Sequence, residues 1–391
     1  MAWETPADES PLLETYSRPG AGLRRYDARG LGTLNALLLA RETLDGGALD
    51  DRALDAAATG AFALLATLEE RLSKFVPESD VALLNALGAE RRVVVGPDLL
   101  RLLEVSRHAW ELTGGAFDPT IGPLMDAWGL VDLDGRIPDA ALLARRLACR
   151  GMDLVDIDSA RSTVRFARPG VAIDLGGIGK GYVADRVAAL LRERGVAAGA
   201  VLSGSSTIVV WGEPARRERW RAEIVHPRDR GAALAEVELE PGALSTSGSA
   251  EREIRVGRER IGHILDPRDG RPVRRVEGVT VWTDSALLGD VVSTTLFVLG
   301  REALAPAGAL SRLLESALGA PGGASAEVAR ASVALVEPDA SVWGGLRLRI
   351  EHFGAPGFRR IDGGDPRDAG DPRGAGGPRD ARGPRDADAG G

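Results

Sequence analysis

The chain lacks paired cysteines. Cys149 is the single cysteine among 391 residues. One thiol excludes an internal disulfide and a zinc site built on cysteine ligands. Because Cys149 lies in an Ala- and Arg-rich stretch of helical character, we interpret it as a small apolar residue rather than a reactive thiol.

Clustered positive charge is also missing. The formal net charge is −8 at pH 7, and the lysines and arginines are scattered among acidic residues. Binding to a nucleic-acid backbone depends on clustered basic side chains that displace counterions. We therefore expect no nucleic-acid partner.

Long apolar runs are absent as well. Residues 1–20 have neither the basic start nor the apolar centre of a secretory signal. No window approaches the roughly 20 apolar residues that a membrane helix needs. These absences predict a cytoplasmic protein without a membrane span.

The chain does contain enough apolar material for a large core. Hydrophobic residues make up 44% of the sequence, mostly Ala, Leu and Val. Residues 363–391 instead repeat short Pro-Arg-Asp units, and such a composition cannot offset chain entropy. We predict a flexible N-terminus over residues 1–23, one folded domain over residues 24–355 and a disordered low-complexity tail over residues 363–391.

Apolar periodicity divides the folded domain into helices and strands. The expected helices cover residues 48–72, 98–112, 139–148, 181–194, 287–299 and 304–318. The expected strands cover residues 34–39, 154–157, 163–166, 171–173, 208–210, 220–225, 234–239, 252–256, 279–282, 332–336 and 346–352. Because helices and strands do not alternate regularly, we predict an α+β fold with a mixed β-sheet core rather than a doubly wound sheet.

Residues 113–120, Thr-Gly-Gly-Ala-Phe-Asp-Pro-Thr, are the first segment whose composition points to a ligand. Glycines let a ligand approach the backbone closely, and Asp118 is held extended because it precedes a proline. A structured exit from the preceding helix explains the same residues equally well.

Residues 174–181, Asp-Leu-Gly-Gly-Ile-Gly-Lys-Gly, lead from a short strand into a helix. Closely spaced glycines and Lys180 at the helix start bring together exposed N–H groups, the helix dipole and a cation. This combination favours a phosphate site over the alternative, in which the glycines serve only a tight turn.

The segment Ser245-Thr-Ser-Gly-Ser249 is followed by His263 and Asp266, in a turn rich in Pro and Gly. An imidazole beside a carboxylate can act as a general base. A lone histidine is more often structural, so this pair alone does not decide between the two roles.

Asp290 and Thr294 stand four residues apart on an expected helix, so their side chains share one face. A carboxylate and a hydroxyl are oxygen ligands of the kind that Mg²⁺ prefers. In the structural alternative, Asp290 caps the helix and Thr294 bonds a backbone carbonyl.

Taken in order, these segments resemble the ApbE family of FAD:protein FMN transferases, and the resemblance covers roughly residues 24–352. It rests on residues 30–33, 72–80, 84–85, 113–120, 174–181, 245–248, 263–272 and 290–300. It implies an ApbE-type, T-fold-like α+β fold. The sequence departs from the family pattern at Leu31, where methionine is usual, at Phe75, where tyrosine is common, and at residues 203–207, where Gly-Gly and an acid are usual.

The resemblance also implies a substrate, FAD, and a cofactor, Mg²⁺. Carried over to this chain, the metal ligands are Asp290, Thr294 and the backbone carbonyl of Gly179. The flavin-binding residues are Leu31, Phe75, Ala116, Phe117, Asp118, Asp174, Gly176, Lys180 and Ile264. The catalytic residues are Lys180, near the phosphates, with His263 and Asp266, near the reacting end.

The chemistry implied by the resemblance is transfer of FMN onto a Ser or Thr hydroxyl of an acceptor protein, with release of AMP. The metal and Lys180 would neutralise the pyrophosphate charge, and His263, or Asp266 through it, would take the hydroxyl proton. Two alternatives remain: an FAD pyrophosphatase that yields FMN and AMP, and a flavin-binding protein without catalysis.

Overall fold

The computed structural model describes most of the chain between residues 23 and 360. The described residues are 23–42, 47–214, 219–249, 253–256, 259–305, 307–316, 330–338, 346–353 and 356–360. The predicted tail over residues 363–391 and residues 1–22 of the predicted flexible N-terminus lie outside the described residues.

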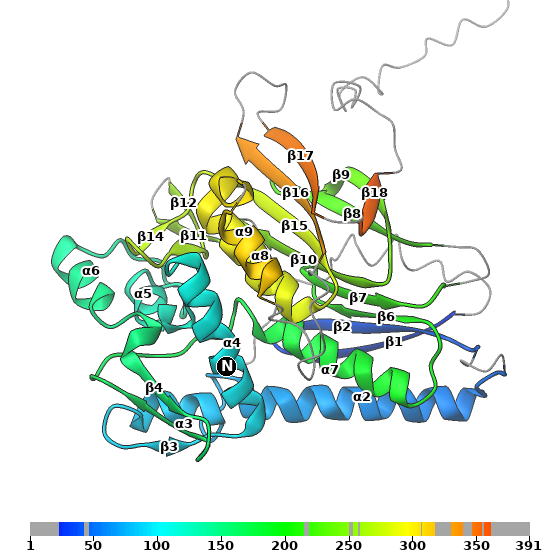
Figure 1. Cartoon of the computed structure of the whole chain (residues 1–391), viewed down its shortest axis with the longest axis horizontal. Helices are drawn as coiled ribbons and strands as arrows, with labels where there is room; N and C mark the ends of the chain where they lie inside the picture. The colour runs from blue at the N-terminus through cyan, green and yellow to red at the C-terminus, as the bar shows by residue number, and fades with distance from the viewer. Residues whose placement is uncertain are drawn as a thin grey trace, which may run out of the picture.

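An eight-stranded sheet forms the centre of the fold (Figure 1). In spatial order its strands are β1 (Leu23–Gly30), β2 (Thr33–Ala40), β6 (Gly199–Ser203), β7 (Thr207–Trp211), β10 (Gly242–Gly248), β15 (Gly278–Thr283), β16 (Ala331–Pro338) and β17 (Leu346–Phe353). Every neighbouring pair in this sheet is antiparallel. The α+β class predicted from the sequence is therefore confirmed.

Helices cover one face of this sheet (Figure 1). Among these, α7 (Gly179–Glu193) contacts both α2 (Asp51–Leu72) and α8 (Ala286–Leu299). α2 buries a stripe of Leu and Ala side chains, as expected for an amphipathic core helix. α8 is buried almost all round, because it packs against β10, β15, α7 and α9 (Ala309–Glu315).

The other face is covered by a three-stranded sheet of β8 (Trp220–His226), β9 (Asp229–Leu239) and β18 (Phe358–Arg360). Between the two sheets lies a cluster of buried Ala, Val, Leu, Ile, Trp and Phe side chains. Successive side chains of a strand point to opposite faces of the sheet, which separates this cluster from the core under the helices. In β7, Ile208 belongs to the cluster between the sheets, whereas Val209 belongs to the core under the helices.

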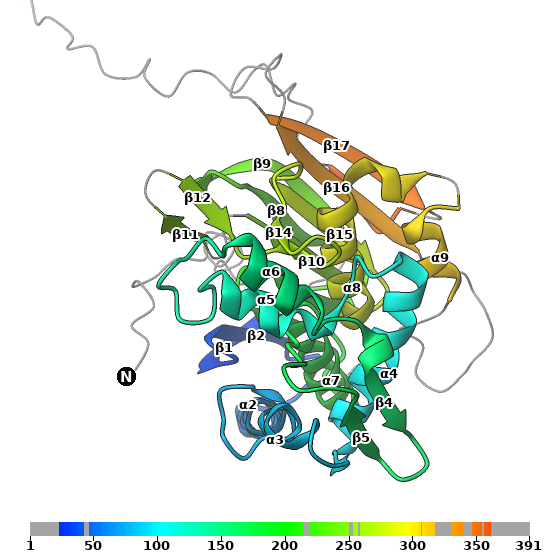
Figure 2. The ribbon, with the colours of Figure 1, turned by 90° about the vertical axis from the view of Figure 1, so that its left-hand side faces the viewer.

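The remaining elements lie at one end of the molecule, on the left in Figure 1 and toward the viewer in Figure 2. One group consists of α3 (Asp80–Leu87), α4 (Pro97–Thr113) and the small sheet of β3 (Val93–Val94), β5 (Thr163–Phe166) and β4 (Val155–Asp158). The other consists of α5 (Gly122–Ala127), α6 (Ala140–Leu147), β11 (Glu253–Val256), β12 (Glu259–Gly262), β13 (Leu265–Asp266) and β14 (Arg271–Pro272). This second group has its own small apolar cluster, so it is packed as a satellite of the main core.

Two sequence predictions about elements were wrong. Residues 171–173 were expected to form a strand, but the Asn85 side chain bonds both the N–H and the carbonyl of Ile173, at 2.7 and 3.0 Å. A side chain therefore takes the place of a partner strand. The helix expected over residues 304–318 begins only at Ala309, after the 3₁₀ segment Gly300–Leu304.

None of the helices in the described ranges combines the length and the apolar character that crossing a bilayer demands.

Candidate functional site

The Asp290 carboxylate lies at the contact between α7 and α8. Its Oδ2 accepts a hydrogen bond from the Gly181 backbone N–H at 2.7 Å, and its Oδ1 accepts one from Thr207 Oγ1 at 3.4 Å. Asp290 is only 7% exposed. The capping role considered as an alternative is wrong, because Ser285 caps α8 and its side chain bonds the N–H of Leu288.

The electrostatic setting of Asp290 suits a bound cation. Burial raises the pKa of the Asp290 carboxyl above its ordinary range, while the Lys180 charge and the Gly181 N–H favour the charged form. A metal ion would favour the charged form in the same way.

Two glycines bring the segment before α7 and its first turn close to α8. An ideal Cβ at Gly177 would lie 3.3 Å from Thr294 Oγ1 and 3.4 Å from Phe117 Cε2. An ideal Cβ at Gly181 would lie 2.2 Å from the carbonyl oxygen of Ala286. At Gly181 the missing side chain is what permits the approach, whereas at Gly177 a Cβ would only be a tight contact.

Lys180 holds its ammonium group beside this contact. Its Nζ donates a hydrogen bond to Ser206 Oγ, in the turn between β6 and β7. α7 begins at Gly179, so the positive end of its dipole and the Lys180 charge lie in the same region. This combination is compatible with the phosphate site that the sequence predicts.

Asp174 ties the glycine-rich segment to the loop after α2. Its Oδ2 accepts from Lys74 Nζ at 2.6 Å, and its Oδ1 accepts from the Gly176 N–H at 2.8 Å. The Lys74 ammonium also lies 5.1 Å from the centre of the Phe75 ring. Phe75 is 66% exposed, so its ring offers a free stacking face at this edge.

Leu31 and Ile264 are both partly buried against the main core. Leu31 lies in the turn between β1 and β2 with a φ of 56°, a left-handed conformation that branched side chains seldom adopt. Ile264 lies directly before β13, and its carbonyl accepts a hydrogen bond from Val273 at 3.0 Å.

The loop over residues 113–120 places a buried carboxyl beside two buried apolar residues. Ala116 and Phe117 are 1% and 3% exposed. Asp118 is extended, as predicted, and its Oδ1 accepts from the N–H and the hydroxyl of Thr120 at 2.9 and 2.5 Å. Burial raises the pKa of Asp118 to about 6, against these hydrogen bonds. Among the described residues, its Oδ2 has no hydrogen-bond partner.

His263 and Asp266 lie on either side of the start of β13, and the side chains of two arginines bind the Asp266 carboxylate. Asp266 accepts from Arg268 at 2.9 and 2.7 Å and from Arg275 at 3.3 Å. Burial acts to raise the pKa of the Asp266 carboxyl, but these arginines hold that pKa below its ordinary value. Asp266 therefore fixes the turn that follows the half-buried His263.

The donor set for a metal is small and consists of oxygen atoms. In the part of the chain that the structure describes, no three His, Cys, Asp or Glu side chains gather as a metal cluster. The candidate ligands are the Asp290 carboxylate, the Thr294 hydroxyl and the Gly179 carbonyl. Such a set fits Mg²⁺, which commonly binds one or two protein carboxylates and completes its shell with water and substrate phosphates.

The sequence did not reveal every residue of this region. Lys74, Asp185, Ser206 and Thr207 all contact a predicted site residue or the helix that carries one. The one usable signal was the spacing of Asp185, four residues after Gly181, which places both on one face of α7.

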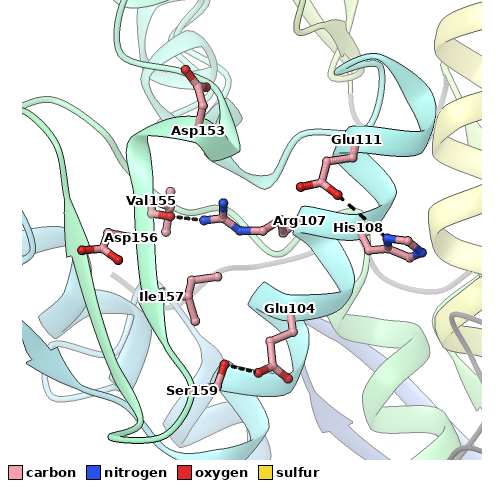
Figure 3. Close-up of a pocket in the computed structure, with 9 residues that line it drawn as sticks. All are labelled: Glu104, Arg107, His108, Glu111, Asp153, Val155, Asp156, Ile157 and Ser159. Atoms are coloured by element: carbon pink, nitrogen blue, oxygen red, sulfur yellow. Dashed lines mark hydrogen bonds and ion pairs between the residues drawn. The ribbon is translucent and has the colours of Figure 1, made fainter.

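A separate open groove lies between α4 and β4 and contains none of the predicted site residues (Figure 3). Its volume is about 580 Å³, and its lining is mostly polar. Several of the side chains that line it are already paired: Ser159 donates to Glu104 at 2.6 Å, and Arg107 donates to the Val155 carbonyl. We assign no ligand to this groove.

Comparison with known sequences places the chain beside flavin transferases. The model of the ApbE family matches residues 32–313. A Klebsiella pneumoniae protein named FAD:protein FMN transferase is 32% identical over 250 residues, which span 63% of this chain and 77% of that protein. A Rhodobacter capsulatus protein of the same name is 35% identical over 219 residues, which span 56% of this chain and 41% of the relative.

Comparison with solved structures gives the same result. The ApbE protein of Thermotoga maritima matches with a TM-score of 0.68 and 25% identity, over 85% of this chain and 97% of that one. The flavinyl transferase ApbE of Pseudomonas stutzeri, in its apo form, matches with a TM-score of 0.67 and 26% identity, over 84% and 94%.

Proposed function

The chain belongs to the ApbE family, and on that premise we propose that it transfers FMN from FAD to a Ser or Thr hydroxyl of an acceptor protein, releasing AMP. The proposal depends chiefly on one observation. The α7–α8 contact gathers a buried carboxylate, a hydroxyl, a lysine and a helix N-terminus around a glycine-rich segment. These are the groups that a pyrophosphate with a divalent cation requires.

We assign the metal site to Asp290, Thr294 and the carbonyl of Gly179, with Mg²⁺ as the ion. When bound, Mg²⁺ supplies neutralisation of the pyrophosphate charge. Lys180 adds a second positive charge, and its hydrogen bond to Ser206 keeps it oriented. Charge neutralisation by fixed groups is the main way in which proteins accelerate transfer at phosphorus.

The rest of the FAD molecule is assigned to the surfaces around this contact. Exposed Phe75 would stack on a planar ring, with Leu31 and Ile264 beside it. Ala116, Phe117 and Asp118 would enclose another part of the substrate. Asp174 and Gly176 shape the glycine-rich segment through their mutual hydrogen bond.

The reaction needs a base for the acceptor hydroxyl. The hydroxyl oxygen would bond to the FMN-side phosphorus, the bond from that phosphorus to the bridging oxygen would break, and AMP would leave with that oxygen. We assign the proton acceptor role to His263. Asp266 would act by holding the turn, because Arg268 and Arg275 already occupy its carboxylate.

The test is an incubation of the full chain with FAD, Mg²⁺ and an acceptor domain that carries an exposed Ser or Thr, followed by intact mass measurement. We expect the acceptor to gain the mass of one FMN, and we expect EDTA to prevent the gain. Conversion of FAD to FMN and AMP without an adduct on any acceptor tested would support a pyrophosphatase instead. Tight binding of unchanged FAD would support a non-catalytic flavin protein.

A further inference from the structure

α7 and α8 meet through three contacts that repeat every four residues. Gly177, just before α7, lies close to Thr294, because an ideal Cβ there would be 3.3 Å from Thr294 Oγ1; Gly181 donates its N–H to Asp290, and Asp185 binds the start of α8 at Ala286. From one contact to the next, the residue number rises by four on the α7 side and falls by four on α8. The pair is therefore antiparallel, with one contact at each turn.

The third contact consists of two hydrogen bonds. The Asp185 carboxylate accepts from the backbone N–H groups of Ala286 and Leu287, each at 2.9 Å. These are two of the four N–H groups that the start of a helix leaves without an intrahelical partner. Ser285 supplies a partner for Leu288 from within the same chain segment, so α8 is capped from its own sequence and also from α7.

Gly181 makes the register of the two helices strict. The ideal Cβ at Gly181 would meet the Ala286 carbonyl oxygen at 2.2 Å and Asp290 Cγ at 2.9 Å. A shift of α8 by one residue would turn it by about 100°. Asp290 would then no longer face the Gly181 N–H, and the proposed ligands on the two helices would separate.

We infer that Asp185 is the positioning residue of the metal site. By accepting hydrogen bonds from the first turn of α8, it holds Asp290 and Thr294 in place relative to Gly179. This inference rests on the proposed function for the identity of the ligands. The hydrogen bonds of Asp185 reach the backbone N–H groups of Ala286 and Leu287, and its carboxylate also interacts electrostatically with Asp290. It acts one turn away, through the backbone of α8.

The test measures metal affinity rather than flavin transfer. Mn²⁺ replaces Mg²⁺, and the signal of free Mn²⁺ is followed by electron paramagnetic resonance as it is titrated into the full chain. We expect Asp185→Ala to raise the Mn²⁺ dissociation constant about tenfold, within the range found for residues that orient metal ligands. Asp185→Asn keeps the volume and one acceptor oxygen, so it should show a smaller increase and also serves if the alanine variant fails to fold.

Asp98→Asn is the matched control. Asp98 is also buried, and its carboxylate accepts from Tyr182 and Arg186 on α7 at 2.6 Å each. Its loss should loosen α7 on another side and lower the melting temperature, but leave the Mn²⁺ dissociation constant within about twofold of wild type.

Two outcomes would overturn the inference: unchanged Mn²⁺ affinity in both Asp185 variants, or an equal loss in the Asp98 and Asp185 variants, which would indicate general destabilisation. Failure of the wild-type chain to bind Mn²⁺ would instead contradict the proposed metal site itself. The two failures are therefore distinguishable.

Discussion

The two faces of the central sheet use the same strands but bury different chemistry. Toward β8 and β9 the sheet packs on an apolar cluster in which Trp282 and Phe358 are almost fully enclosed. Toward α8 it buries hydroxyls, among them Ser245 and Thr207, close to the Asp290 carboxylate. The four buried aspartates of the described chain belong to neither of the two packed sheets.

This difference indicates that one face of the sheet mainly stabilises the fold, whereas the other carries the polar groups of the proposed site. Apolar burial on one face stabilises the fold at roughly 25 cal/mol for each Å² removed from water. The other face can then contain buried polar groups, provided that they bond one another. Substitutions on the apolar face should therefore change stability, whereas those at the α7–α8 contact should change catalysis.

The largest expected effect is that of Asp290→Ala on transfer. Because this variant removes the only carboxylate of the proposed metal site, we expect the rate to fall about a thousandfold, equal to several kcal/mol of transition-state stabilisation. The rate of FMN addition to the acceptor measures it. Asp284→Ala is the control, since Asp284 is 44% exposed and paired with Arg330 on the surface. An equal loss in the control would contradict the assignment.

Trp282→Ala should lower the stability of the fold and leave the transfer rate unchanged. Trp282 is fully buried on the apolar face, so its loss should lower the free energy of unfolding by about 3–5 kcal/mol. Transfer by the folded protein should keep its rate. Urea unfolding and activity at low temperature measure the two quantities. A large loss of activity in fully folded protein would contradict the division between the faces.

Gly181→Ala tests the close approach of the helices. Its Cβ would lie 2.2 Å from the Ala286 carbonyl, so the backbone must move. We expect transfer to fall about a hundredfold, as for a small misplacement of catalytic groups. Gly231→Ala in β9 is the control, because its Cβ meets nothing closer than 3.4 Å. An active Gly181→Ala enzyme would show that the α7–α8 contact tolerates a shift.

The buried Asp118 carboxyl should make stability depend on pH. Its pKa is raised from 3.8 to about 6, so the folded state binds a proton more tightly than the unfolded state does. The associated stability is present below pH 3.8 and is lost as pH rises through about 6. The loss amounts to about 2–3 kcal/mol.

Asp118→Asn should flatten the dependence of unfolding free energy on pH between about pH 4 and 6. Denaturant titrations at several pH values measure it. Asp132→Asn, at an exposed aspartate, should leave the slope unchanged. If Asp118→Asn and wild type give parallel curves, Asp118 does not titrate in this range.

The smallest effect is expected at Phe75. Because its ring is 66% exposed, Phe75→Ala should change the free energy of unfolding by less than about 0.5 kcal/mol. Loss of a stacking face should still raise the KM for FAD about tenfold. Val94→Ala, at a residue 74% exposed, is the control for steady-state kinetics. An unchanged KM would remove Phe75 from the flavin site.

Periodic apolar segments made much of the fold predictable from sequence. The stripe of α2 and the apolar run of β15 match their predicted positions closely. β10 was missed for a physical reason: Leu244 faces the apolar cluster, but Ser245 and Ser247 face α8. A strand whose buried face consists of hydroxyls has no apolar alternation to detect.

The same limit applies to the functional site. Asp290 and Thr294 could be paired from their spacing on one helix, because that relation is local in sequence. Asp185 could not be connected to α8, because its partners are backbone N–H groups about a hundred residues away. Backbone partners leave no pattern in the residue types, so only the packed structure reveals them.

The most direct test of the proposed FMN transfer is the ratio of AMP released to FMN bound on the acceptor. The full chain is incubated with FAD and Mg²⁺, with and without the acceptor; AMP is measured by chromatography and bound FMN by intact mass. We expect one AMP for each FMN adduct, and little AMP when the acceptor is absent. Equal AMP release with and without the acceptor, accompanied by free FMN, would contradict it.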